Sequence, residues 1–223
     1  MAATDLLQSL ALVPLTLLPI MNPLSGAPVF SMTVGGDPAA TRQLARQVAI
    51  NCWFVLVGSM LVGTYVLELF GISLPIVRIG GGLLVAASGW RMLNRNDDDE
   101  VHAAVKRTQP GAWTHAEVVR RSFFPITFPL TTGPGTIAAA IAIGAGWPRQ
   151  LDMYVTGALV AVLGATLTVG VVYLVYRHAA ALMAKLGEVG ALVMVRLMAF
   201  MLLCIGIEIM WTGWAELNGI SSR

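Results

Sequence analysis

Charged residues are scarce in this chain of 223 residues. Only 12% of its residues are Asp, Glu, Lys or Arg, 57% are hydrophobic, and the mean hydropathy is +0.75. A soluble domain carries about 25% charged residues, so the composition argues against one. The formal net charge of +2 also leaves no basic surface of the kind that binds nucleic acid.

Cysteine is nearly absent as well. Cys52 and Cys204 are the two cysteines, and they occupy different positions within their apolar segments. A membrane thiol oxidoreductase needs two cysteines that can approach and exchange electrons. We therefore expect both to be buried packing residues and the protein not to be an enzyme. No spacing of ligands predicts a metal or another cofactor.

Six apolar segments predict an all-α integral membrane protein. Each is long enough to cross a bilayer, which takes roughly 20 residues. The predicted transmembrane helices cover approximately 6–34, 44–70, 73–94, 121–146, 153–177 and 189–215.

Two of these segments contain the same motif, Pro-Leu-[Ser/Thr]-x-x-Pro, which begins at Pro23 and again at Pro129. Proline lacks an N–H and its ring clashes with the preceding turn, so an unbroken helix cannot continue through either motif. Irregular backbone at membrane depth is tolerated where it is buried in protein or lines a cavity. Paired breaks of this kind point to a transport site.

The broken helices predict a site for a zwitterion. Pro28 and Pro134 are suited to begin new half-helices, whose N-termini near Gly26 and Gly133 offer N–H groups to a carboxylate. Carbonyls at the ends of the upstream half-helices suit an ammonium group. No acid lies near either break, which favours a neutral solute over a cation. The predicted binding residues are Asn22, Pro23, Ser25, Gly26, Pro28, Pro129, Thr131, Thr132, Gly133, Pro134 and Gly135.

A second correspondence predicts an inverted repeat. Val77-Arg78-Ile79 in the third segment matches Val195-Arg196-Leu197 in the sixth. Each unit holds three spans, and an odd number makes the second copy enter from the opposite side. The predicted organisation is a first repeat over 1–95, a cytoplasmic connection over 96–120 and a second repeat over 121–223. The acidic run 97–100 in the connection lacks the spacing of a Ca²⁺ loop and is expected to be solvated.

Lysines and arginines predict the orientation. Ten of them fall on one side of the membrane, and only Arg149 and Arg223 fall on the other. Because basic loops stay in the cytoplasm, both termini are expected outside. The ten are Arg42, Arg46, Arg91, Arg95, Lys106, Arg107, Arg120, Arg121, Arg177 and Lys185. Aromatic residues expected at the membrane interfaces are Trp90, Trp147, Tyr176, Trp211 and Trp214.

Four polar residues inside spans are candidates for gating or coupling. Burying a charge in hydrocarbon is costly, which singles out Arg78, Arg196 and Glu208. Both arginines lie near span ends, so snorkelling to the headgroups is the alternative. An ion pair between Arg78 and Glu208 is open at this stage. Asn51 fits a hydrogen bond between helices as well as it fits a solute contact.

The two motifs with their surroundings, Asn22 to Phe30 and Phe128 to Thr136, resemble the MarC family of six-span bacterial membrane proteins. The likeness covers essentially the whole chain, and the family is distantly similar to the lysine exporters. It implies a transporter, exporting small neutral amino acids across the cell inner membrane, with the lipid bilayer as its surroundings. A thiol oxidoreductase and a channel are the alternatives, and assembly as a homo-oligomer is left open.

The orientation can be tested by labelling. Cysteines placed near Gly71 and Pro148 should react with an impermeant thiol reagent added to intact cells, whereas cysteines near Asp98 and Ala184 should react only after permeabilisation. Labelling near Asp98 in intact cells would contradict the predicted topology.

Overall fold

The computed structural model describes residues 3–94, 118, 120–147 and 151–220, and their regular structure is entirely helical. This confirms the predicted all-α class. The predicted connection 96–120, with its acidic run, falls outside these residues except at 118 and 120. The elements are α1 (Ala3–Met21), α2 (Pro23–Val34), α3 (Pro38–Leu69), α4 (Leu74–Leu93), η1 (Ser122–Thr131), α7 (Pro134–Ala145), α8 (Leu151–Arg177) and α9 (Ala179–Leu217).

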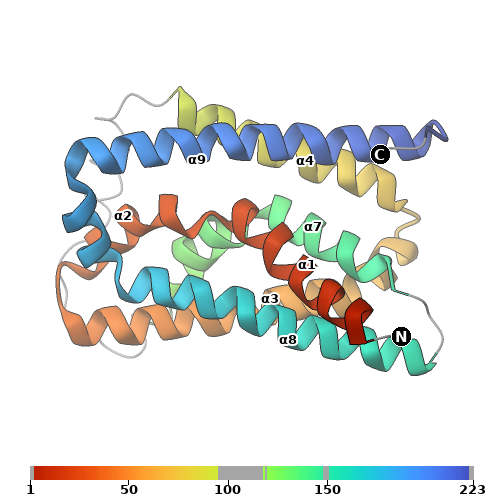
Figure 1. Cartoon of the computed structure of the whole chain (residues 1–223), viewed down its shortest axis with the longest axis horizontal. Coiled ribbons are helices and arrows are strands. Elements are labelled where there is room, and N and C mark those ends of the chain that lie inside the picture. The colour runs from red at the N-terminus through yellow and green to blue at the C-terminus, as the bar shows by residue number, and fades with distance from the viewer. Residues whose placement is uncertain (1–2, 95–117, 119, 148–150, 221–223) are drawn as a thin grey trace.

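Within the described residues, four helices are long and apolar enough to cross a membrane: α3, α4, Val155–Arg177 of α8 and Leu192–Leu217 of α9. Two further spans are broken. The first is formed by Gln8–Met21, which is most of α1, together with α2, and the chain bends by 55° between them. The second is formed by η1 and α7, with a bend of 68°. If each bent pair is one span, the chain has up to six, with breaks in the first and fourth as expected. The two termini lie at the same end of the bundle (Figure 1).

Proline marks the start of four helices. α2, α3 and α7 each begin with one, and α4 has Pro75 at its second position. The missing N–H is harmless there because the first N–H groups of a helix have no partner within it. Asp37 caps α3 by accepting a hydrogen bond of 2.8 Å from the Ala39 N–H.

Helices α4 and α9 pack along each other and form one layer (Figure 1). Their backbones touch through glycines: a Cβ on Gly82 would lie 2.6 Å from the Gly206 carbonyl oxygen, and a Cβ on Gly89 would lie 2.7 Å from the Ala199 carbonyl oxygen. The other helices hold most of the buried core, to which this pair contributes Val85, Ala179 and Leu202. We call α4 and α9 the helix pair and the remaining helices the core layer.

The contacts between elements follow the pattern that an inverted repeat would produce. If α1–α4 correspond to η1–α9, the packing of α3 on α7 corresponds to that of α8 on α2, and α4 on α7 corresponds to α9 on α2. All four contacts are present. The inverted repeat itself stays a prediction. The sixth span, Leu192–Leu217, lies close to the predicted 189–215. Helix α9 itself starts earlier, because a short helical segment from Ala179 precedes a kink at Gly187, where φ is 65°.

Candidate functional site

The first break is capped by hydrogen bonds between its own residues, Asn22 and Ser25. Asn22 adopts the left-handed conformation, with φ 44° and ψ 59°, and caps α2. Its backbone oxygen accepts from the N–H and hydroxyl of Ser25 at 3.1 and 2.9 Å, and its Oδ1 accepts from the same N–H at 3.4 Å. α2 therefore begins at Pro23. The prediction that Pro28 begins this half-helix is wrong: Pro28 lies inside α2, because the asparagine turns the chain one residue before Pro23.

The second break is capped on one side only. Upstream, hydroxyls satisfy the carbonyls of η1: Thr131 donates to Ile126 at 2.8 Å and Thr132 donates to Thr127 at 2.9 Å. Downstream, Gly133 precedes α7 without a side-chain cap, and Pro134 begins the helix as predicted. The first hydrogen bond within α7 runs from the Ile137 N–H, so the preceding N–H groups at the helix start remain available.

Both breaks line one cavity of about 670 Å³, which we call the break cavity. Seven of the predicted residues line it: Asn22, Ser25, Pro129, Thr131, Gly133, Pro134 and Gly135. Four do not, namely Pro23, Gly26, Pro28 and Thr132. No acid is among the lining residues, and the positive end of α7 faces them.

Helix α4 supplies residues that the sequence reasoning missed. Leu84, Val85, Ser88, Arg91 and Met92 line the break cavity. Arg91 donates to the Ser88 hydroxyl at 3.4 Å, and Ser88 donates to the Leu84 carbonyl at 2.8 Å. The sequence pattern places Arg91 among the basic residues of the cytoplasmic side and does not predict it for the site. Its spacing from Ser88 and Leu84, three and seven residues, places these side chains on one helical face and was the available signal.

Tyr176 joins the two motifs. It is fully buried, so the prediction that it lies at the membrane interface is wrong. Its hydroxyl lies 2.7 Å from the Thr131 hydroxyl, and its ring stacks on Phe30 at 4.7 Å. Gly26 lies against the same hydroxyl, where a Cβ would approach to 2.6 Å. Gly26 therefore makes room for Tyr176 and does not contact the cavity.

The remaining polar candidates lie away from the break cavity. Asn51 donates to the Ser122 hydroxyl at 3.2 Å and joins α3 to η1. Arg196 donates to the Leu93 carbonyl at the end of α4. Arg78 pairs with Glu216. The acid that pairs with Arg78 is therefore Glu216, nearer the end of α9, and not Glu208. Glu208 itself is exposed on α9.

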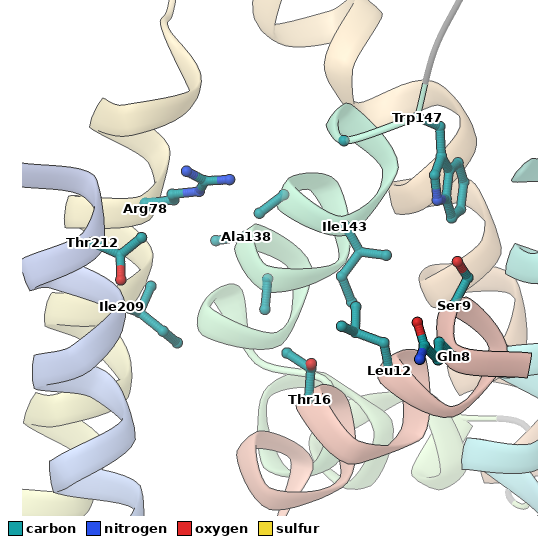
Figure 2. Close-up of a pocket in the computed structure, with 13 residues that line it drawn as sticks. Gln8, Ser9, Leu12, Thr16, Arg78, Ala138, Ile143, Trp147, Ile209 and Thr212 are labelled. Atoms are coloured by element: carbon teal, nitrogen blue, oxygen red, sulfur yellow. The ribbon is translucent and has the colours of Figure 1, made fainter. Parts of the chain in front are cut away.

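A second cavity, of about 900 Å³, lies toward the termini, and we call it the termini-side cavity. Figure 2 shows Arg78 and Thr212 of the helix pair on one wall and Gln8, Leu12 and Thr16 of α1 on the other. Its α7 lining includes Ala138, one turn beyond Gly135 of the break cavity. Between the two cavities α7 packs on α4, with Gly135 against Val85 and Ala138 against Gly81.

The two cysteines are free and lie on different elements. Cys52 is buried in α3, as expected, but Cys204 is exposed on α9, so the prediction of a buried residue is wrong there. The error arose because α9 is apolar on all sides and its sequence gives no buried face.

The fit between Gly26 and Tyr176 generates a stability prediction. Gly26→Ala should lower the free energy of unfolding by about 1 to 3 kcal/mol, since overpacking a core costs that much. Tyr176→Phe removes the hydroxyl, so Gly26→Ala should cost much less in that background. Thermal unfolding of the purified protein measures both effects, and Gly58→Ala, whose Cβ meets nothing within 4 Å, is the control. Equal costs in the two backgrounds would contradict the assignment.

Comparison with known proteins agrees with this architecture. The sequence profile of the family described as "MarC family integral membrane protein" matches residues 7–218. The chain is 31% identical over 218 residues to the "UPF0056 inner membrane protein MarC" of Escherichia coli O1:K1 / APEC and of strain UTI89, and the alignments cover 96% of this chain and 97% of each relative. The protein of the same name from strain K12 matches equally well. No solved structure matches the chain. With a family match over nearly its whole length and the two predicted helix breaks in place, this protein belongs to the MarC family of integral membrane proteins.

Proposed function

We propose that this protein is a secondary transporter that exports small neutral amino acids across the cell inner membrane. The observation that carries the proposal is the meeting of two helix breaks in one cavity, beside the uncapped start of α7. The relatives' printed name supports the inner membrane as the location. No enzyme activity, metal or cofactor is part of the proposal.

The carboxylate of the solute binds at α7. The N–H groups of Gly135 and Thr136 precede the first hydrogen bond within the helix, and the helix dipole adds positive potential there. Arg91 lines the same cavity and strengthens the preference for an anionic group. The ammonium group meets the carbonyl end of α1, where Ile20 and Met21 line the cavity. A cationic solute would find no acid among the lining residues.

The position of the break cavity is compatible with loading from the cytoplasm. Arg91 and Met92 lie in the last turn of α4, at the end of the bundle opposite the termini (Figure 1). With both termini outside, as the basic residues predict, this end faces the cytoplasm. The break cavity then faces the cytoplasm, the side from which the proposed exporter loads its solute. The packing of α7 on α4 separates it from the termini-side cavity, which favours a carrier over an open channel.

Carboxylate recognition can be tested with amides. Purified protein in liposomes should take up labelled small neutral L-amino acids with saturation, and unlabelled amino acids should compete. Amino acid amides lack the carboxylate and should compete roughly tenfold worse or more, because hydrogen bonds to a charged group contribute about 1.5 to 3 kcal/mol. Equal competition by amide and amino acid would refute the proposed binding mode.

The contact between the two cavities gives a second test. Gly135→Ala places a methyl group against the Val85 side chain, so it should force α7 and α4 apart and reduce uptake by roughly tenfold or more. Val85→Ala makes room, so the double variant should regain much of the activity. Gly80→Ala is the matched control, because Gly80 lies on α4, the helix of Val85, and a Cβ there meets nothing within 4 Å. Wild-type uptake by Gly135→Ala at normal abundance would show that this contact is dispensable.

The thiol oxidoreductase alternative has a direct test. α3 and α9, which carry the two free cysteines, do not pack closely. Changing Cys52 and Cys204 together to Ala should therefore leave folding and uptake largely intact. Complete loss of function at normal protein abundance would favour the redox reading.

A further inference from the structure

Arg78 is a cation held inside a membrane-spanning helix and directed into a cavity. Its side chain is only 24% exposed, and it lines the termini-side cavity. In Figure 2 the guanidinium extends from α4 toward α7, across the space that separates the helix pair from α1. A charge at such a position is costly unless it has a partner. Arg78 has such a partner in Glu216, an acid in the last turn of α9.

The acid that pairs with Arg78 does not line the cavity. Glu216 lies in the last turn of α9 and its side chain is 44% exposed, whereas the cavity is lined by other residues. A second carboxylate that reaches Arg78 from the cavity can take the place of Glu216 and keep the arginine paired, so the exchange leaves no buried charge alone. Arginine is also the side chain best suited to bind a carboxylate through two parallel hydrogen bonds.

The rest of the cavity suits a small zwitterion. Opposite Arg78, α1 contributes neutral oxygen-bearing side chains at Gln8, Ser9 and Thr16 (Figure 2). Between these walls α7 contributes alanines, including Ala138 and Ala142, which leave room for a small apolar side chain. The lining holds one cation and no acid. Its volume of about 900 Å³ lies within the range of small-molecule sites, roughly 300 to 1,000 Å³.

We propose that the termini-side cavity is a second binding site for a small carboxylate solute, whose carboxylate replaces Glu216 on Arg78. The choice of an amino acid as the solute rests on the proposed function. The same solute then has two stations, one at α7 in the break cavity and one at Arg78, on either side of the contact between α4 and α7. Figure 2 shows that the two walls of this second station come from the helix pair and the core layer.

The experiment uses thiol labelling in nanodiscs, where both faces of the protein are accessible. Leu12 lines the cavity and is 52% exposed, so Leu12→Cys in a background of Cys52→Ala and Cys204→Ala serves as the reporter. L-alanine and acetate should slow its reaction with a methanethiosulfonate reagent, and alaninamide should not. Ser25→Cys in the same background reports on the break cavity separately.

Variants of the ion pair decide the assignment. Arg78→Gln should raise the L-alanine concentration for half-protection at least tenfold at Leu12→Cys and leave protection at Ser25→Cys within about twofold. Arg78→Lys should fall between Arg78→Gln and wild type. Glu216→Gln removes the competing carboxylate and should lower the concentration several-fold. This last variant keeps the arginine, so the proposal remains testable if Arg78→Gln fails to fold.

Failure of this site and failure of the proposed function give different results. Protection by alaninamide equal to that by L-alanine, or protection unchanged in both Arg78→Gln and Glu216→Gln, overturns the second site even if amino acid uptake is normal. Protection that depends on Arg78 supports the site even if uptake of amino acids in liposomes is absent, in which case only the proposed transport function fails.

Discussion

The structure depends on one constraint: a backbone that leaves the helical path at membrane depth must still satisfy its polar groups. Lipid hydrocarbon offers no hydrogen bonds, and a polar group left unpaired in it costs several kcal/mol. The first break meets the constraint through Asn22, which turns the chain and accepts from Ser25. The second meets it through threonine hydroxyls that return to carbonyls within η1. The N–H groups at the start of α7 have no such partner, so they are free to bind a solute.

The same constraint explains the buried tyrosine. The Thr131 hydroxyl already donates within η1, and the Tyr176 hydroxyl at 2.7 Å completes its hydrogen bonding. Phe30 stacks on the ring and Gly26 gives way to the hydroxyl, so the two motifs are held at a set separation through α8. Hydrogen bonds of this kind between membrane helices contribute roughly 0.6 to 2 kcal/mol each. The main effect of Tyr176 is therefore to fix the positions of the two breaks relative to each other.

Glycine has a different role in the helix pair. Without side chains at Gly82, Gly89 and Gly206, α4 and α9 approach until their backbones touch. Close packing of small residues is the main attractive force between helices in lipid, since the hydrophobic effect does not favour their association there. The two helices of the pair pack along each other more extensively than either packs on the core layer. Both cavities have walls from each layer, so a small movement of one layer against the other would change the access to both.

Local steric rules account for what the sequence alone determined. Proline cannot continue a helix, so the motifs at Pro23 and Pro129 located both breaks, and the apolar runs located the spans. Pro134 was placed correctly at the start of α7 for the same reason. Pro28 was misplaced because Asn22 can adopt a left-handed turn that the proline spacing does not reveal. Four of the predicted binding residues pack away from the cavity.

Tertiary structure alone decided which side chains meet. The rotation of each helix about its axis sets its neighbours, and helices that are apolar on all sides carry no stripe from which that rotation can be read. This is why Tyr176 and Cys204 were each assigned to the wrong environment. It is also why Arg91 joined the break cavity unexpectedly and Arg78 found Glu216, 138 residues away along the chain. The sequence determined where the chain breaks and crosses the membrane, and the packing of uniformly apolar helices determined what surrounds each break.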